Sequence, residues 1–178
     1  QTLKQIEDMK ADYNARATTL KEWIESTTNG MNERENLENL AAVEGKVGEL
    51  EGYKKDTKPP KASEKLEVEQ CYSNLTMKLR AQGRPPFDPP AGLSVQDIDQ
   101  AWHGLGDSER AREQWLRDEM AKQRQLEQLL KKFWNQVGNL EEFGGKKEGV
   151  LGTLEGEVYE TLDQVQGRQK MVGALNQE

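Results

Sequence analysis

The chain has 178 residues, of which 34% are hydrophobic, 32% charged and 6% aromatic, and its formal net charge is −7. Globular domains usually have about 45–50% apolar residues, so this composition excludes one large compact core and favours long amphipathic helices, which need only an apolar stripe each. The acidic balance argues against binding to nucleic acid. No apolar run approaches the roughly 20 residues that span a bilayer. The single cysteine, Cys71, cannot form an internal disulfide and favours a reducing compartment.

The six prolines stand in three pairs and divide the chain into segments that permit long helices, because a proline inside a helix costs about 3 kcal/mol. Before the first pair, apolar residues recur at spacings of three and four, which is the period of a helix. We predict a first helix over residues 1–28, ended by Asn29 and Gly30. We predict a second helix over 33–81, interrupted at 58–61 by the double proline.

A third helix is predicted over residues 94–120, after a loop at 81–93 that holds the other two proline pairs. Ser94 and Asp97 mark its start. A serine hydroxyl caps the first turn, and an acid three residues later favours the positive end of the helix dipole. Residues 1–120 would then form one three-helix unit, and residues 121–178 a second, partial one.

A seam of residues spaced by seven extends along the third helix and beyond it. Its members are Ile98, Leu105, Arg112, Glu119, Leu126, Phe133 and Leu140. The seam predicts one helix that is unbroken to about Glu142, where Gly144 and Gly145 would end it. Its two charged members indicate a change of packing partners midway. Helices of this length are typical of coiled coils and helical repeats.

The last segment is predicted to be another amphipathic helix. Its apolar stripe consists of Val150, Leu151, Leu154, Val158, Leu162, Val165, Val172 and Leu175. Because an exposed apolar stripe requires cover, residues 146–178 complete a repeat either within this chain or against a second chain. The sequence leaves both possibilities open.

Several short motifs occur in order between residues 20 and 135. They are Leu20-Lys-Glu-Trp23-Ile24, Lys58-Pro-Pro-Lys61, Arg84-Pro-Pro-Phe87, Ala101-Trp102 and Glu113-Gln-Trp115-Leu116. Together they resemble the first rod repeat of the α-actinin family, in the short-rod form of lower eukaryotes. The resemblance implies an all-α fold: an elongated three-helix spectrin-repeat bundle with a long continuous helix leading into a partial second repeat. The sequence departs from the family at Phe143, where the second repeat would carry a tryptophan.

The resemblance implies a mechanical function, as the rod of a cytoplasmic, cytoskeletal protein that crosslinks actin filaments. Two chains would pair antiparallel and space two actin-binding ends. Actin would bind through flanking domains that this chain does not hold, a calponin-homology pair upstream and an EF-hand module downstream. Cytoskeletal or membrane-protein adaptors are further expected partners. The alternative is a monomeric helical-bundle module that docks partner helices of membrane or signalling proteins.

The candidate residues are therefore structural. Core packing of the bundle is predicted for Trp23, Tyr53, Leu75, Ile98, Trp102, Leu105 and Leu116. A candidate dimer interface is predicted at Trp134, Leu151, Leu154, Val158 and Leu162, because Trp134 follows Phe133 and cannot share its helix face. We predict no enzyme activity and no catalytic, cofactor or metal site, since the only histidine is His103 and Cys71 lacks a base partner.

Overall fold

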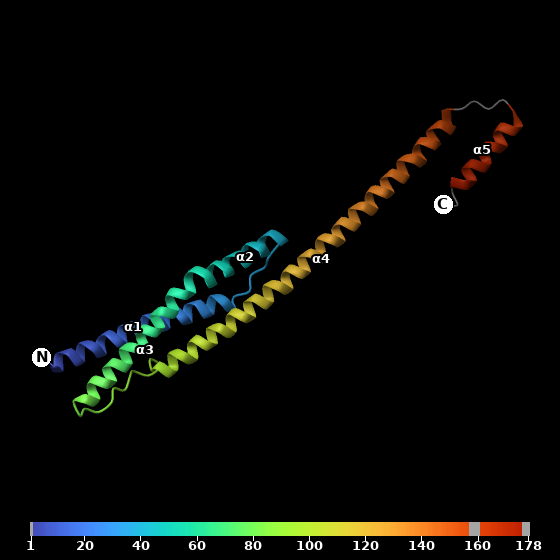
Figure 1. Cartoon of the computed structure of the whole chain (residues 1–178). Coiled ribbons are helices and arrows are strands. Elements are labelled where there is room, and N and C mark those ends of the chain that lie inside the picture. The colour runs from blue at the N-terminus through green and yellow to red at the C-terminus, as the bar shows by residue number, and fades with distance from the viewer. Residues whose placement is uncertain (1, 157–160, 176–178) are drawn as a thin grey trace. The chain divides into compact units, whose positions relative to one another are not determined.

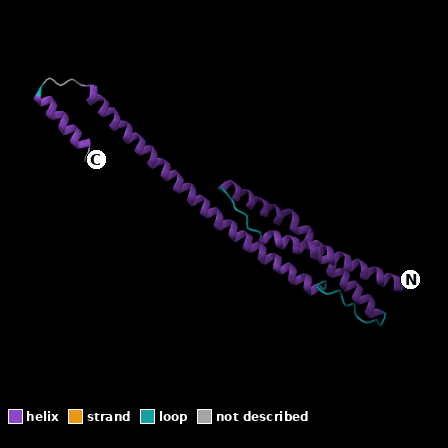
Figure 2. Ribbon diagram, turned by 180° about the vertical axis from the view of Figure 1, so that it is seen from behind, coloured by secondary structure: helices purple, strands orange, loops and turns teal. Residues whose placement is uncertain are grey.

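The computed structural model describes residues 2–156 and 161–175 (Figure 1). The regular elements within these ranges are all helical. They are α1 (Thr2–Asn32), α2 (Leu40–Gly52), the π-helical turn η1 (Tyr53–Thr57), α3 (Lys58–Ala81), α4 (Val95–Gly156) and α5 (Leu162–Leu175). Figure 2 shows only helices and loops in the part of the chain that the structure describes. The all-α prediction is confirmed. The chain divides into two compact units, Gln1–Arg124 and Gln125–Glu178.

The first unit is a three-helix bundle. Its layers are α1, the continuous run α2–η1–α3, and the part of α4 that begins at Val95 (Figures 1 and 2). One cluster of buried side chains joins all three layers and consists of Tyr13, Ala17, Leu20, Ile24, Val68, Ile98 and Leu105. The spacing of three and four along α1 places its buried residues on a single face, as an amphipathic helix requires.

The first helix ends four residues later than predicted, at Asn32. Asn29 and Gly30 do not stop it, because a glycine ends a helix by taking a positive φ, and in the described residues only Gly83 and Gly92 do so. The extra turn carries Met31, which packs against the core clusters on both sides of it. Burial of this side chain therefore favours continuation of the helix.

The second helical layer begins at Leu40, not at residue 33 as predicted. Asn39 caps it, and its side-chain oxygen accepts a hydrogen bond of 2.9 Å from the Ala42 amide. Residues 33–39 are held as a connection by two side chains of α4. Arg112 donates to the Glu33 carbonyl, and Gln123 donates to the Leu37 carbonyl at 2.9 Å. Backbone groups bound in this way are not available to a helix ladder.

The interruption predicted at 58–61 is not a gap in the helical layer, because α2, η1 and α3 follow one another without a break. Instead the helix widens to the π-turn η1 before the prolines, and the Lys58 amide bonds the Tyr53 carbonyl five residues back. Pro59 and Pro60 then occupy the first turn of α3, the part of a helix where proline is tolerated best. The prolines thus fix where α3 begins.

The helix α4 begins at Val95, one residue after the start predicted from the sequence. The Asp97 amide donates to Ser94 Oγ at 3.1 Å, and Ser94 Oγ donates to the Asp97 carboxylate at 2.7 Å. These bonds lower the pKa of the Asp97 carboxyl. Next to this cap, the buried Tyr13 hydroxyl donates to the Leu93 carbonyl at 2.6 Å, and burial raises the pKa of Tyr13 to about 12.

The predicted helix stop at Gly144 and Gly145 is wrong, because α4 continues to Gly156. Glu142 and Lys146 form an ion pair of 2.7 Å across the two glycines. Lys147 lies 5.0 Å from the centre of the Phe143 ring. Such contacts between residues four apart support a helix that glycine weakens.

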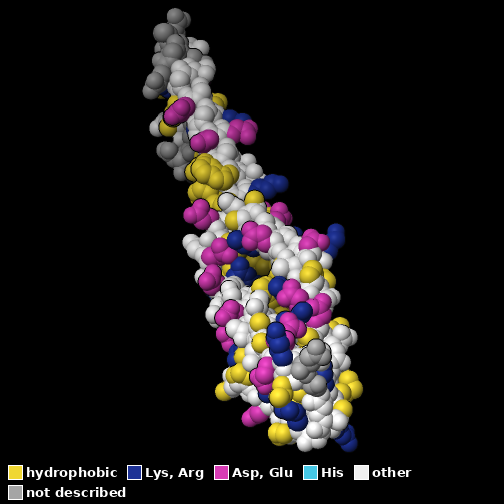
Figure 3. Space-filling model, turned by 90° about the vertical axis from the view of Figure 1, so that its left-hand side faces the viewer, with side chains coloured by type: hydrophobic (Ala, Val, Ile, Leu, Met, Phe, Trp, Pro, Cys, Tyr) yellow, Lys and Arg dark blue, Asp and Glu magenta, His cyan; other side chains and the backbone are white. Residues whose placement is uncertain are grey.

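Ion pairs connect the second layer to α4 along its length. The pairs are Lys54–Glu113, Lys58–Glu109 and Lys65–Asp99, each at 2.5 Å. The hydrogen bond from Lys54 lowers the pKa of the Glu113 carboxyl, and that from Lys65 lowers the pKa of the Asp99 carboxyl. Because one helix supplies the lysines and the other the carboxylates, the pairs favour this pairing of layers. Acidic and basic side chains are interspersed over much of the visible surface (Figure 3).

Acid should weaken the first unit through these carboxylates. Their folded pKa values lie below the unfolded values of about 3.9 for Asp and 4.3 for Glu, so the stabilisation is present above about pH 5 and is lost as the pH falls through the folded values. In the double variant Asp99→Asn/Glu113→Gln, we expect the thermal midpoint to fall less steeply between about pH 6 and pH 3 than in the parent chain.

The matched control is Asp107→Asn, because Asp107 pairs with Arg110 on its own helix. This variant should keep the parent's pH profile. Equal slopes for the double variant and the parent chain would show that the inter-helix pairs do not carry the acid sensitivity.

Two leucines at equivalent positions of α4 should respond differently to truncation. Leu105 is fully buried, whereas Leu126, which lies three heptads later, is 48% exposed. Leu105→Ala should lower the free energy of unfolding by about 2–5 kcal/mol, as for other buried leucines. Leu126→Ala should change it by less than about 1 kcal/mol in the monomer. Denaturant titration at submicromolar concentration measures both, and equal losses would contradict the burial difference.

Candidate interaction surface

The core residues predicted from the sequence lie in the first unit. Leu75, Ile98, Leu105 and Leu116 are buried there. Trp23, Tyr53 and Trp102 are half-buried and form one cluster at the π-turn. The rings of Trp23 and Tyr53 are stacked with centres 6.4 Å apart, and those of Trp23 and Trp102 are 6.2 Å apart.

A buried carboxylate that the sequence analysis missed anchors this aromatic cluster. Glu109, only 5% exposed, accepts a hydrogen bond of 2.7 Å from the Tyr53 hydroxyl and one of 2.5 Å from Lys58. Burial and then the bond to Glu109 raise the pKa of Tyr53. Lys58 also lies 5.6 Å from the centre of the Trp102 ring. The signal was present in the sequence, because Glu109 lies four residues after Leu105 on the helix face that carries the seam.

Arg112 and Gln123 are the other buried polar residues of α4. Besides the Glu33 carbonyl, Arg112 bonds the Glu35 carboxylate at 2.9 Å, which lowers the pKa of Glu35. The Arg112 guanidinium also lies 4.7 Å from the centre of the Trp115 ring. Arg112 therefore occupies its seam position as a buried anchor for the connection before α2.

Beyond Gln123 the apolar face of α4 is exposed. Its large side chains, each 45–70% exposed, form what we call the exposed seam: Leu126, Leu129, Leu130, Phe133, Leu140, Phe143 and Leu151. Trp134, 65% exposed, lies beside this seam. Soluble monomers rarely leave a contiguous apolar patch of this kind uncovered. Figure 3 shows a compact patch of hydrophobic side chains at the molecular surface.

The exposed seam continues the face that is buried earlier in the same helix. Leu126, Phe133 and Leu140 extend the seven-residue series of Ile98 and Leu105. Within the first unit, buried positions of α4 recur as far as Gln123, which reaches the Leu37 carbonyl. Within the second unit, the side chains of this series are exposed. The seven-residue spacing is thus the same in both parts of α4, and the parts differ in whether other helices bury the apolar face.

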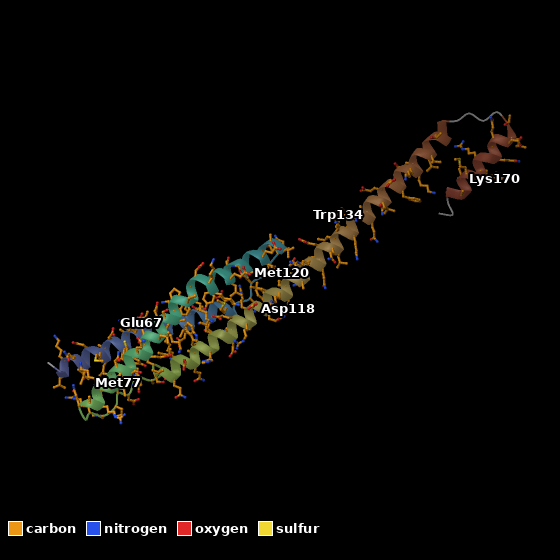
Figure 4. All side chains as sticks on the ribbon, viewed as in Figure 1. Glu67, Met77, Asp118, Met120, Trp134 and Lys170 are labelled. Carbon is orange, nitrogen blue, oxygen red and sulfur yellow. The ribbon has the colours of Figure 1, made fainter. Side chains whose placement is uncertain are left out.

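The predicted interface residues are exposed where the structure describes them. Trp134 lies on α4 (Figure 4), 65% exposed, with its ring edge-on to that of Phe133 at 5.4 Å. Leu151 and Leu162 are also exposed. The side chain of Leu154 and all of Val158 lie outside the described residues. On α5 the exposed apolar side chains are Leu162, Val165, Met171 and Val172.

His103 lies on α4 and Cys71 on α3. His103 is exposed, and its Nδ1 lies 2.7 Å from the Asp99 carbonyl oxygen. Cys71 is half-buried, and burial raises the pKa of its thiol. Among the residues that the structure describes, no three His, Cys, Asp or Glu side chains are placed to hold a metal ion. Within the same ranges, no helix has the length and apolarity needed to cross a membrane.

Comparison with known proteins gives no matching family model, but it gives clear relatives. The chain is 32% identical over 177 residues to alpha-actinin A of Dictyostelium discoideum. This aligned region makes up 99% of this chain and 20% of the relative. It is 34% identical over 145 residues to alpha-actinin-1 of Gallus gallus, covering 82% of this chain and 16% of the relative. It is 38% identical over 125 residues to the spectrin beta chain of Drosophila melanogaster, covering 70% of this chain and 6% of the relative.

The chain thus spans a fifth or less of the length of these relatives. The resemblance expected from the sequence motifs is confirmed. The chain is a homologue of alpha-actinins and of a spectrin beta chain, and its helical bundle is consistent with an alpha-actinin-like spectrin-repeat rod segment.

Proposed function

We propose that the chain is part of the structural rod of a protein that crosslinks actin filaments. Its relatives are named alpha-actinin and spectrin. The rod acts mechanically, without a chemical step, and sets the distance between two actin-binding ends. Actin binds through domains outside this chain, and the protein works in the cytoplasm as a component of the cytoskeleton.

The exposed seam is the observation that carries the proposal. Its side chains are as apolar as those that α4 buries in the first unit, and yet they face solvent. Burial of apolar surface stabilises by about 25 cal/mol per Å², so covering the seam favours association. A second copy of the chain offers the same seam, and a two-fold pair covers both at once.

Antiparallel pairing is the arrangement that makes a spacer. The second unit of one chain then lies against the first unit of the other, so the two ends of the pair are equivalent and far apart. Parallel pairing would instead place both actin-binding ends together. Antiparallel pairing also covers the apolar residues of α5, including Leu162 and Val165, which are exposed in the single chain.

The chain should be a dimer at micromolar concentration in sedimentation equilibrium. Phe133→Glu/Leu140→Glu should shift it to monomer, because two charges would have to be buried at the centre of the contact. The thermal midpoint of the first unit should remain unchanged, since both side chains are exposed in the monomer.

Met77→Glu is the matched control, because Met77 is 62% exposed on α3 and lies outside the seam (Figure 4). It should leave the dimer intact. A monomeric parent chain at micromolar concentration would refute the crosslinker rod for this segment. It would favour the alternative, a bundle that docks helices from other proteins on the same seam.

A further inference from the structure

We infer that the loop between α3 and α4 is a docking site for a protein domain of the SH3 kind, which binds polyproline II segments in a groove lined by aromatic side chains. This loop, which we call the proline loop, consists of residues 82–94 and lies at the end of the bundle where α1 begins (Figures 1 and 2). It belongs to the first unit. The inference therefore goes beyond the proposed rod and does not depend on self-association.

Prolines make the backbone of the proline loop extended. They stand as Pro85-Pro86 and Pro89-Pro90, and each proline ring holds its own φ at about −65°. The residue before a proline is also confined to extended conformations, because its α-helical region is disfavoured. Residues 84–90 accordingly form neither helix nor turn. Both proline pairs therefore suit the polyproline II conformation, which proline-recognising domains bind.

Backbone hydrogen bonds fix both ends of this extended segment. At its start, the Arg84 amide donates to the Leu79 carbonyl at 3.0 Å. At its end, the Leu93 amide donates to the Pro90 carbonyl at 3.0 Å, across a turn in which Gly92 has a φ of 79°. A segment that is already held in its bound conformation loses less conformational entropy on binding. The fold thus favours binding of the proline loop by a rigid groove.

Phe87 anchors one side of the segment to the bundle. Its ring centre lies 5.6 Å from that of Tyr13 and 6.4 Å from that of Tyr72. Because polyproline II has three residues per turn, the neighbours of Phe87 belong to the other two faces. Pro86 and Pro89 share one of these faces, at the Pro-x-x-Pro spacing that aromatic grooves recognise. Pro86 is exposed and Pro89 is half-buried.

Basic side chains border the prolines, although the chain as a whole has a net charge of −7. Arg80 and Arg84 are exposed, and in the described part of the chain neither guanidinium forms an ion pair. A hollow of about 290 Å³ beside Pro85-Pro86 is lined also by Arg84 and Lys10. Asp88 is the only acidic residue of the proline loop. We expect the partner's groove to carry acidic side chains at its rim, because complementary charges speed and orient association.

Titration of the full chain with a panel of purified SH3 domains tests the inference, with calorimetry as the readout. At least one domain should bind the parent chain. Pro86→Ala/Pro89→Ala should weaken this binding about tenfold or more, because both anchors of the groove contact are removed. Pro90→Ala is the matched control, since Pro90 is three residues after Phe87 and shares its face. It loosens the loop in the same way but should change the affinity less than about twofold.

A charge variant provides the second test. Arg80→Glu/Arg84→Glu should weaken binding of the same SH3 domain, and the affinity of the parent chain should fall as the salt concentration rises. The control Arg110→Glu/Arg124→Glu makes the same change of charge at exposed positions of α4 and should bind as the parent chain does. An unchanged thermal midpoint in each variant shows that the bundle stays folded.

The outcomes separate a docking site from a loop that only connects two helices. Binding that is lost in Pro86→Ala/Pro89→Ala and kept in Pro90→Ala supports the inference. Binding by no SH3 domain of the panel, or equal losses in the two proline variants, would overturn it. Binding to phosphatidylserine vesicles in place of SH3 domains would also overturn it and would assign the arginines to a membrane surface. None of these results bears on the proposed rod, which sedimentation equilibrium tests separately.

Discussion

The rest of the structure depends on which part of the apolar face of α4 is packed against other helices. This helix carries its apolar residues with nearly constant spacing from Val95 onward, so its intrinsic pattern does not distinguish one unit from the other. In the first unit α1 and the α2–η1–α3 run bury that face, and Leu105 and Leu116 are inaccessible. In the second unit the equivalent side chains are exposed. The free energy gained by covering them is what drives any association of the chain.

Buried polar side chains of α4 fix how far along this helix the second helical layer packs. Arg112 and Gln123 hold the connection before α2 by its backbone carbonyls, and Glu109 holds the π-turn through Tyr53 and Lys58. Burying a charged or polar group without its hydrogen-bond partners costs free energy. Each of these residues therefore favours the chain arrangement that supplies its partners. They keep the second helical layer on the part of α4 that precedes the exposed seam.

The sequence predicted the helical fold, the start of α4 and the family resemblance, because these depend on local signals such as the Ser94–Asp97 cap and the apolar period. It failed where tertiary contacts outweigh local preference. Gly144 and Gly145 look like a helix stop, but glycine stops a helix only when φ becomes positive, and the contacts of Phe143 and Lys146 span them. The double proline is typical of a helix break, but the helix continues through it, with the π-turn η1 immediately before it. Periodicity also could not show that Phe133 and Leu140 are exposed while Ile98 and Leu105 are buried, because a heptad identifies a face and not its partner.

The proposed self-association through the exposed seam takes the form of an isologous contact. Each residue pair in a two-fold interface occurs twice, so the contribution of every apolar contact is counted twice. In the proposed self-association, apolar side chains of the exposed seam such as Leu130 and Phe133 therefore need only modest individual contributions. The same doubling applies to repulsion, so one like-charge contact near a two-fold axis counts twice against association.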